Sequence, residues 1–183
     1  MSSQTEIHKF LATPELPDLG PGPRPGVRTE PELAAELTML FKTAGIPAQR
    51  QDLIRALVLL WHDHLDTAHE IAQAVDNQDG AFLHGIMHRR EPDYGNAAYW
   101  FRRVGQHPAF PEMARRVTTL LQTKGEGALL EKLVPKGKWA AFAFIKACEQ
   151  AAESGKPGKQ AALLREIQKV ESEALLDWFS EPA

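Results

Sequence analysis

Hydrophobic residues from Thr29 onward recur at steps of three and four, which is the period of an α-helix. The first run, residues 29–45, has Thr29 as an N-cap and Gly45 as a stop. The next run follows Pro47 and continues to Val75 without a helix breaker, so we predict one long helix there. No stretch alternates with the period of two that a half-buried strand requires.

Glycine and proline divide the rest of the chain into shorter helical runs. Helices are expected over residues 80–91, 94–104, 111–123, 128–133, 139–154 and 159–179. About seven to eight helices in all predict an all-α fold of antiparallel helical hairpins, or a bundle. In the hairpin of residues 80–104, small residues at Gly85 and Ala97 favour a close crossing, with Phe101 as its core anchor.

The N-terminal segment has a different composition from the rest of the chain. Five of the 13 prolines lie at positions 14, 17, 21, 23 and 25, among several glycines, a mixture that opposes regular secondary structure. We therefore predict an extended Pro/Gly-rich arm over residues 1–28 and a single all-α domain over residues 29–183. Because such an arm has few backbone hydrogen bonds to lose, we expect it to be dispensable for folding.

Charge and cysteine content narrow the class of protein. The chain carries 24 acidic and 21 basic residues, a formal net charge of -3, which disfavours binding to nucleic acid. Cys148 is the single cysteine and lies among apolar residues, as a buried core thiol would. No apolar stretch approaches the roughly 20 residues that a membrane helix needs, and no leader is evident, so we expect a cytoplasmic protein without a membrane partner.

Six of the seven histidines lie between positions 62 and 107. On one continuous helix three polar side chains would share a face: His62, Asp66 and His69. His64 would instead lie on the apolar face, where a structural role is expected. His84, His88 and Glu91 repeat the polar spacing on the next helix.

Antiparallel packing would bring these two polar stripes together. Imidazole and carboxylate groups in that number suit a divalent transition metal. The candidate metal ligands are His62, Asp66, His69, His84 and His88. The alternative interpretation is that these histidines are exposed or hydrogen bonded on solvated helix faces.

Arginines and aromatic residues accompany the histidines. Candidate ligand-binding residues beyond the imidazoles are Arg89, Arg90, Glu91, Tyr99, Trp100, Arg102 and Arg103. A pair of guanidinium groups grips a carboxylate or a phosphate, and an aromatic ring stacks on a flat ligand. The alternative is that the arginines pair with nearby acidic residues in a salt-bridge network.

The segment LHGIMHRREPDYGNAAYWFRRVGQHP, residues 83–108, follows WHDHLDTAHEIAQ, residues 61–73. Together they resemble the signature of a group of uncharacterised, mostly microbial proteins. The resemblance implies no activity, cofactor or catalytic residue; it implies that this block is the group's site.

Three functions are compatible with these features. The first is binding of a small anionic ligand, with or without a metal, in a pocket formed by residues 61–107. The second is a metal-dependent hydrolase or oxidoreductase that uses the histidine cluster, and whether the protein is an enzyme stays open. The third is a helical scaffold for protein interaction. The oligomeric state is not indicated by the sequence.

Overall fold

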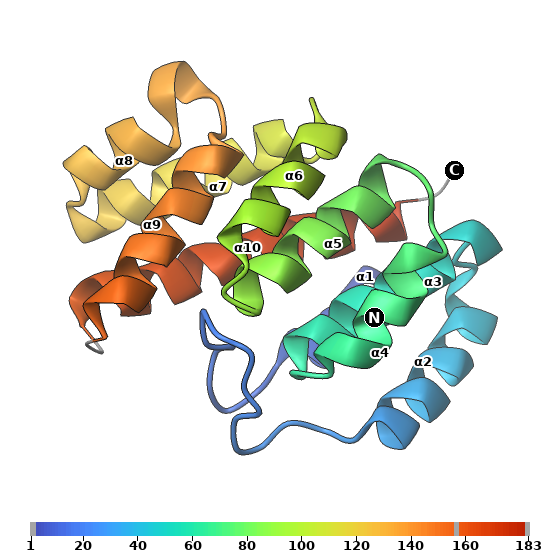
Figure 1. Ribbon diagram of the computed structural model, residues 1–183. Coiled ribbons are helices and arrows are strands. Elements are labelled where there is room, and N and C mark those ends of the chain that lie inside the picture. The colour runs from blue at the N-terminus through green and yellow to red at the C-terminus, as the bar shows by residue number, and fades with distance from the viewer. Residues whose placement is uncertain (1–2, 156–157, 182–183) are drawn as a thin grey trace.

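The computed structural model describes residues 3–155 and 158–181, and throughout these ranges the regular elements are helical (Figure 1). The α-helices are α1 (Ser3–His8), α2 (Glu30–Ala44), α3 (Ala48–Trp61), α4 (Leu65–Gln73), α5 (Gln78–Arg90), α6 (Tyr94–Val104), α7 (Phe110–Lys124), α8 (Gly127–Leu133), α9 (Ala141–Ser154) and α10 (Lys159–Ser180). Two 3₁₀ turns, η1 (Lys9–Leu11) and η2 (Pro135–Gly137), complete the described elements. The all-α prediction is confirmed, and the most extensive contacts between helices join neighbours in the chain, α5 with α6 and α3 with α4. The predicted count of seven to eight was too low for two reasons, given next.

The first reason is a break in the predicted long helix. Helix α3 ends at Trp61 and α4 begins at Leu65, because Asp63 adopts a left-handed backbone conformation with φ of 67°. The carboxylate of Asp63 accepts hydrogen bonds from Arg24 at 2.5 Å and from Arg90 at 2.6 Å. These two ion pairs stabilise a kink that no glycine or proline announces.

The second reason is that the start of the arm is helical. Residues 3–11 form α1 and η1, in which Ile7, Phe10 and Leu11 are buried in the core. Helix α1 packs against α10 and α2. Residues 12–29 then loop along the lower edge of the molecule to α2, without a further helix (Figure 1). Because this segment supplies core side chains, we now expect it to be required for folding, in contrast to the dispensable arm that its composition indicated.

Helices α5 and α6 form the tight hairpin that was predicted. Asn77 caps α5 by accepting from the amide of Gly80, and Asp93 caps α6 by accepting from the amide of Asn96. A Cβ atom at Gly85 would lie 2.5 Å from the ring of Phe101, so only glycine permits this approach. Phe101 is buried, which confirms its predicted role as the anchor of the hairpin.

The C-terminal helix α10 joins the two halves of the fold. It is the longest helix, with 22 residues, and passes behind the α5–α6 hairpin to contact α3, α7 and α9 (Figure 1). None of the helices in the described residues is long and apolar enough to cross a membrane.

Candidate functional site

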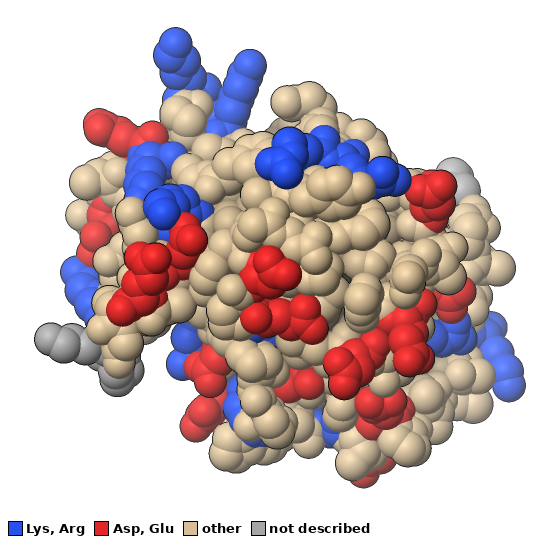
Figure 2. All heavy atoms as spheres, in the orientation of Figure 1, with Lys and Arg blue, Asp and Glu red and all other residues tan. Residues whose placement is uncertain are grey.

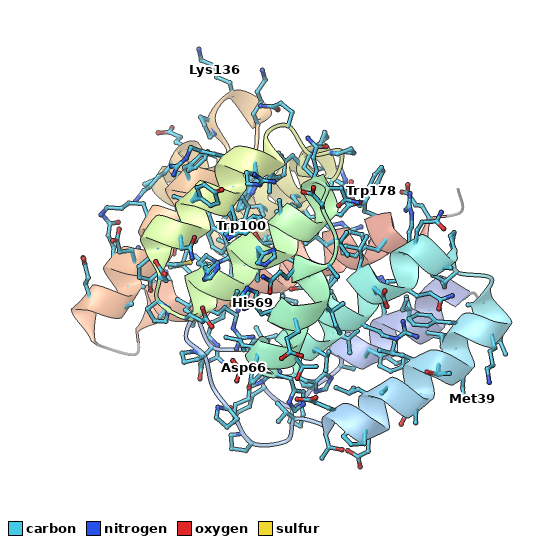
Figure 3. All side chains as sticks on the ribbon, turned by 45° about the vertical axis from the view of Figure 1, so that its right-hand side comes forward. Met39, Asp66, His69, Trp100, Lys136 and Trp178 are labelled. Atoms are coloured by element: carbon cyan, nitrogen blue, oxygen red, sulfur yellow. The ribbon has the colours of Figure 1, made fainter. Side chains whose placement is uncertain are left out.

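Three imidazoles meet where α4 packs against the α5–α6 hairpin. The ring centroid of His69 lies 4.9 Å from that of His84 and 5.6 Å from that of His88, and the rings of His84 and His88 lie 6.2 Å apart. Trp100, from α6, stacks on His84 with a centroid distance of 4.0 Å and an interplanar angle of 6°. Figure 3 shows His69 and Trp100 on the same side of the molecule. We call His69, His84, His88 and Trp100 the histidine cluster.

His84 is the unusual member of the histidine cluster. It is 2% exposed, and neither of its ring nitrogens has a hydrogen-bond partner among the described residues. Burial, and after it the nearby imidazole of His69, lower the pKa of His84 to about 4. The backbone carbonyl of Gly80, one turn earlier in α5, opposes this shift. At neutral pH His84 therefore buries one N–H donor and one lone pair, both unpaired.

His88, by contrast, is held by polar neighbours. Its Nδ1 lies 3.1 Å from Oε2 of Glu91, and the side-chain nitrogen of Asn96 lies 3.1 Å from its Nε2. Carboxylate contacts of this kind fix the orientation and tautomer of a histidine. Asn96 was missed in the sequence because it follows His88 by eight residues, across the turn at Pro92, and only the hairpin brings the two together.

A phenylalanine at position 84 is expected to stabilise the protein. Leaving a buried polar group unpaired costs about 1–3 kcal/mol, and an aromatic ring of similar shape would keep the stack on Trp100. We expect His84→Phe to raise the free energy of unfolding at pH 7.5 by about 1–2 kcal/mol in urea titrations.

The same variant should also remove a pH dependence. The folded pKa of His84 lies below the ordinary value, so the unfolded chain binds more protons between about pH 6.5 and pH 4. Stability is thus full above this window and falls as pH decreases through it. From pH 7.5 to pH 5 the wild type should lose about 2 kcal/mol more than His84→Phe. Burial alone would raise the pKa values of Asp63 and Asp79, but hydrogen bonds lower both. The partners are Arg24 and Arg90 for Asp63, and His107 and Trp178 for Asp79. These two carboxylates therefore change the stability only at a lower pH than His84 does.

His62→Phe is the matched control for this substitution. His62 is also buried, but its Nδ1 accepts from the amide of Arg28 and its Nε2 donates to the carbonyl of Phe10. Phenylalanine there loses both hydrogen bonds and should destabilise. Destabilisation of similar size in both variants would show that His84 is an ordinary structural histidine.

The structure separates two predicted metal ligands from the cluster. The kink at Asp63 turns His62 away from the face of His69 and towards the arm, where both of its nitrogens are used. Asp66 is exposed and lies nearer the arm than His69 does (Figure 3). It lines a small groove with other acidic residues, including Glu30 and Glu91. The predicted shared face of His62, Asp66 and His69 is wrong because it assumed a continuous helix.

Two of the predicted ligand-binding arginines are internal structural groups. Arg89 is 1% exposed and donates to both carboxylate oxygens of Glu171 in α10, while Arg90 is 2% exposed and binds Asp63 and the carbonyls of Leu60 and Gly20. A guanidinium group enclosed in this way cannot grip a ligand from solvent. The alternative of a salt-bridge network is therefore correct for both arginines, although Glu171 and Arg24 lie far away in sequence and were not foreseen.

The remaining arginines and Tyr99 lie on the surface of α6. Arg102, Arg103 and Tyr99 are exposed, and the guanidinium of Arg103 lies 5.4 Å from the ring centroid of Trp100. Arg103 also pairs with exposed Asp76 at 3.4 Å. Figure 2 shows basic side chains over the C-terminal end of α6 and acidic ones along α4 and the α5–α6 turn. The cluster thus lies between a basic and an acidic surface.

The donor atoms do not form a metal site as they are placed. In residues 3–155 and 158–181, no group of three or more His, Cys, Asp or Glu side chains has an arrangement that could hold a metal ion. His69, His84 and His88 contact one another through ring faces and edges rather than through converging nitrogens.

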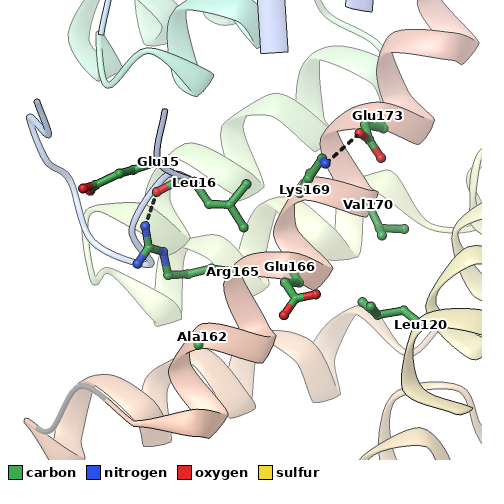
Figure 4. Close-up of a pocket in the computed structure, with 9 residues that line it drawn as sticks. All are labelled: Glu15, Leu16, Leu120, Ala162, Arg165, Glu166, Lys169, Val170 and Glu173. Atoms are coloured by element: carbon green, nitrogen blue, oxygen red, sulfur yellow. Dashed lines mark hydrogen bonds and ion pairs between the residues drawn. The ribbon is translucent and has the colours of Figure 1, made fainter. Parts of the chain in front are cut away.

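A larger groove lies away from the cluster, between the arm, α7 and α10 (Figure 4). Its volume is about 710 Å³, and its two basic side chains already have partners. Arg165 donates to the carbonyls of Leu16 and Pro17, and Lys169 pairs with Glu173 at 3.6 Å. Its basic residues thus serve the fold, and the histidine cluster is the stronger candidate site.

No protein-family model, curated protein or solved structure matches this chain. The geometry of the histidine cluster is therefore the feature of this protein that bears most directly on its function.

Proposed function

We propose that the protein binds a small anionic ligand at the histidine cluster. The observation that carries this proposal is the pair of unpartnered nitrogens on buried His84. An apolar residue would fill the same space without the cost of burying unpaired polar atoms. Groups that reduce stability in this way are typical of sites retained for function.

The surroundings of His84 favour an anion. Imidazoles gain positive charge on protonation, and three of them lie within 6.2 Å of one another, ring centre to ring centre. The positive charge of Arg103 also acts on His84. Tyr99 is exposed beside Trp100, so a flat anion such as an aromatic carboxylate would gain stacking on Tyr99 as well as charge.

The two alternative functions are supported by fewer features of the structure. A metal-dependent hydrolase or oxidoreductase needs the imidazole nitrogens to turn towards a common point, and it would proceed without His62. A helical interaction scaffold does not explain why an unpaired histidine is buried. A cytoplasmic location belongs to the proposal and agrees with a single, buried cysteine.

The proposal is tested by following the histidine side chains with ¹H–¹⁵N NMR during titration with sulfate and with acetate. We expect saturable shifts of His69, His84 and His88 at millimolar or lower concentration, while His62 and His107 stay unchanged. The two bonded histidines serve as internal controls, because His107 is engaged by Asp79 and by the amide of Ala109.

Variants identify the site. His84→Gln combined with His88→Gln should abolish the response, whereas His8→Gln, on α1, should preserve it. Absence of saturable binding of either anion would contradict the proposal. Binding of one equivalent of zinc, with no change of the histidine resonances on addition of either anion, would favour the metal-dependent alternative instead.

A further inference from the structure

The histidine cluster is closed in the structure. The indole of Trp100 covers one face of His84 at 4.0 Å, and His69 lies edge-on at 4.9 Å. Both covering residues are only partly buried, whereas the nitrogens of His84 are fully buried. A ligand can therefore reach His84 only if Trp100 or His69 moves outward, and these two side chains form a cover over a buried base.

The groups that face His84 are mostly neutral or positive. Helix α4 contributes His69, α5 contributes His88 and the carbonyl of Gly80, and α6 contributes Trp100 and the charge of Arg103. Glu91 is the carboxylate bound to the cluster, but it contacts His88 rather than His84. A protonated His84 would thus have no carboxylate bound to it.

We infer that the anion enters the histidine cluster together with one proton, which His84 takes from solvent when Trp100 or His69 moves aside. This inference rests on the proposed function. The proton binds the free lone pair of His84, so that both ring nitrogens become N–H donors and the ring becomes a cation. The anion then supplies the missing counter-ion and an acceptor. Each of the two partners strengthens the binding of the other.

The coupling between proton and anion binding determines how the affinity for the anion changes with pH. Because the closed site disfavours the protonated ring, an empty cluster holds neutral His84 at pH 7, and its low pKa agrees with this. Binding of the anion must raise the pKa of His84, so affinity increases as pH falls. The ligand class is therefore a small oxyanion that stays ionised in weak acid, such as a carboxylate or a sulfate or phosphate ester.

Sulfate is the probe of choice, because it neither takes up nor releases a proton between pH 5.5 and pH 7.5. Wild-type protein is titrated with sulfate at pH 5.5, 6.5 and 7.5, with the ¹⁵N resonances of His84 and the tryptophan emission recorded together. We expect both nitrogens of His84 to move to imidazolium values on binding, and the affinity to increase by up to about tenfold per pH unit. A cationic ring or an outward movement next to Trp100 should also change its emission.

Two variants separate His84 from its neighbours. His84→Gln, which cannot take up a proton, should lose the pH-dependent part of sulfate binding that belongs to position 84. His8→Gln should keep it, since His8 lies on α1 and pairs with Asp177 of α10 rather than with a member of the histidine cluster. Because the wild-type resonances report protonation directly, the test holds even if a variant folds poorly.

The outcomes distinguish this inference from the function on which it depends. Sulfate binding with His84 still neutral overturns the coupled proton and leaves anion binding intact. Absence of sulfate binding at all three pH values overturns this inference, and absence of acetate binding as well overturns the proposed function. The inference is also overturned if sulfate binding protonates His69 or His88 while His84 keeps the resonances of the free protein, because the proton then binds a different ring.

Discussion

Deletion of residues 1–28 is expected to abolish the cooperative thermal transition of this protein. The segment places Ile7, Phe10 and Leu11 in the core, and each large apolar side chain lost from a core costs about 2–5 kcal/mol. The loss summed over these three side chains is comparable to the roughly 5–15 kcal/mol by which a folded domain is stable. Circular dichroism on heating should show a broad, non-cooperative loss of helix.

The deletion also leaves polar groups without partners. His62 would lose both of its hydrogen bonds, to Phe10 and Arg28, and Asp63 would lose Arg24. Arg90 would then be the remaining ion-pair partner of the buried Asp63 carboxylate. Since Asp63 shapes the kink between α3 and α4, we expect the loss to reach the position of His69 as well.

Point variants make this prediction specific. Phe10→Ala should retain a cooperative transition at a lower temperature, whereas Pro25→Ala, at an exposed position, should change stability by no more than about 0.5 kcal/mol. A truncated protein that melts cooperatively within a few degrees of the full chain would show that the arm is an appendage, as its composition first indicated.

Helix periodicity predicted the elements of this fold well where the signals are local. Residues 94–104 form the helix that was expected, and Gly85 meets Phe101 as the small-residue crossing requires. A proline and a glycine lie just after the two helices of this hairpin, and both are signals that can be read locally in the sequence. The pairing of His84 with His88 followed from their spacing on that same hairpin.

The failures have two physical causes, and the first is that long-range ion pairs overrode a local pattern. Asp63 sits in a run without glycine or proline, yet it adopts a left-handed conformation because Arg24 and Arg90 bind its carboxylate. Nothing near position 63 in the sequence shows this. The second cause is that the average composition of residues 1–28 concealed a helical segment at residues 3–11, where no proline occurs and Ile7, Phe10 and Leu11 reach the core.

We expect substitution of Arg89, which forms a buried ion pair with Glu171, to lower the free energy of unfolding more than substitution of any other single charged residue in the segment 61–107. Both side chains are 1% exposed, and the guanidinium also lies 4.5 Å from the ring centroid of Phe144. Breaking such a pair leaves an uncompensated buried charge and costs about 3–5 kcal/mol. We therefore expect Arg89→Met to lose that amount in urea unfolding, and Glu171→Leu to lose a similar amount.

Replacing both partners should reverse most of the loss, and this outcome decides what Arg89 is for. An apolar pair of similar volume is often as stable as a buried ion pair, so Arg89→Met with Glu171→Leu should come within about 1–2 kcal/mol of the wild type. The exposed pair Arg115–Glu112 is the control, where Arg115→Met should leave the stability nearly unchanged because solvent screens the pair. If Arg89 is structural, the double variant still binds sulfate with wild-type affinity, because the histidine cluster keeps its residues. A stable double variant that no longer binds sulfate would return Arg89 to the binding site, where its position in the sequence first placed it.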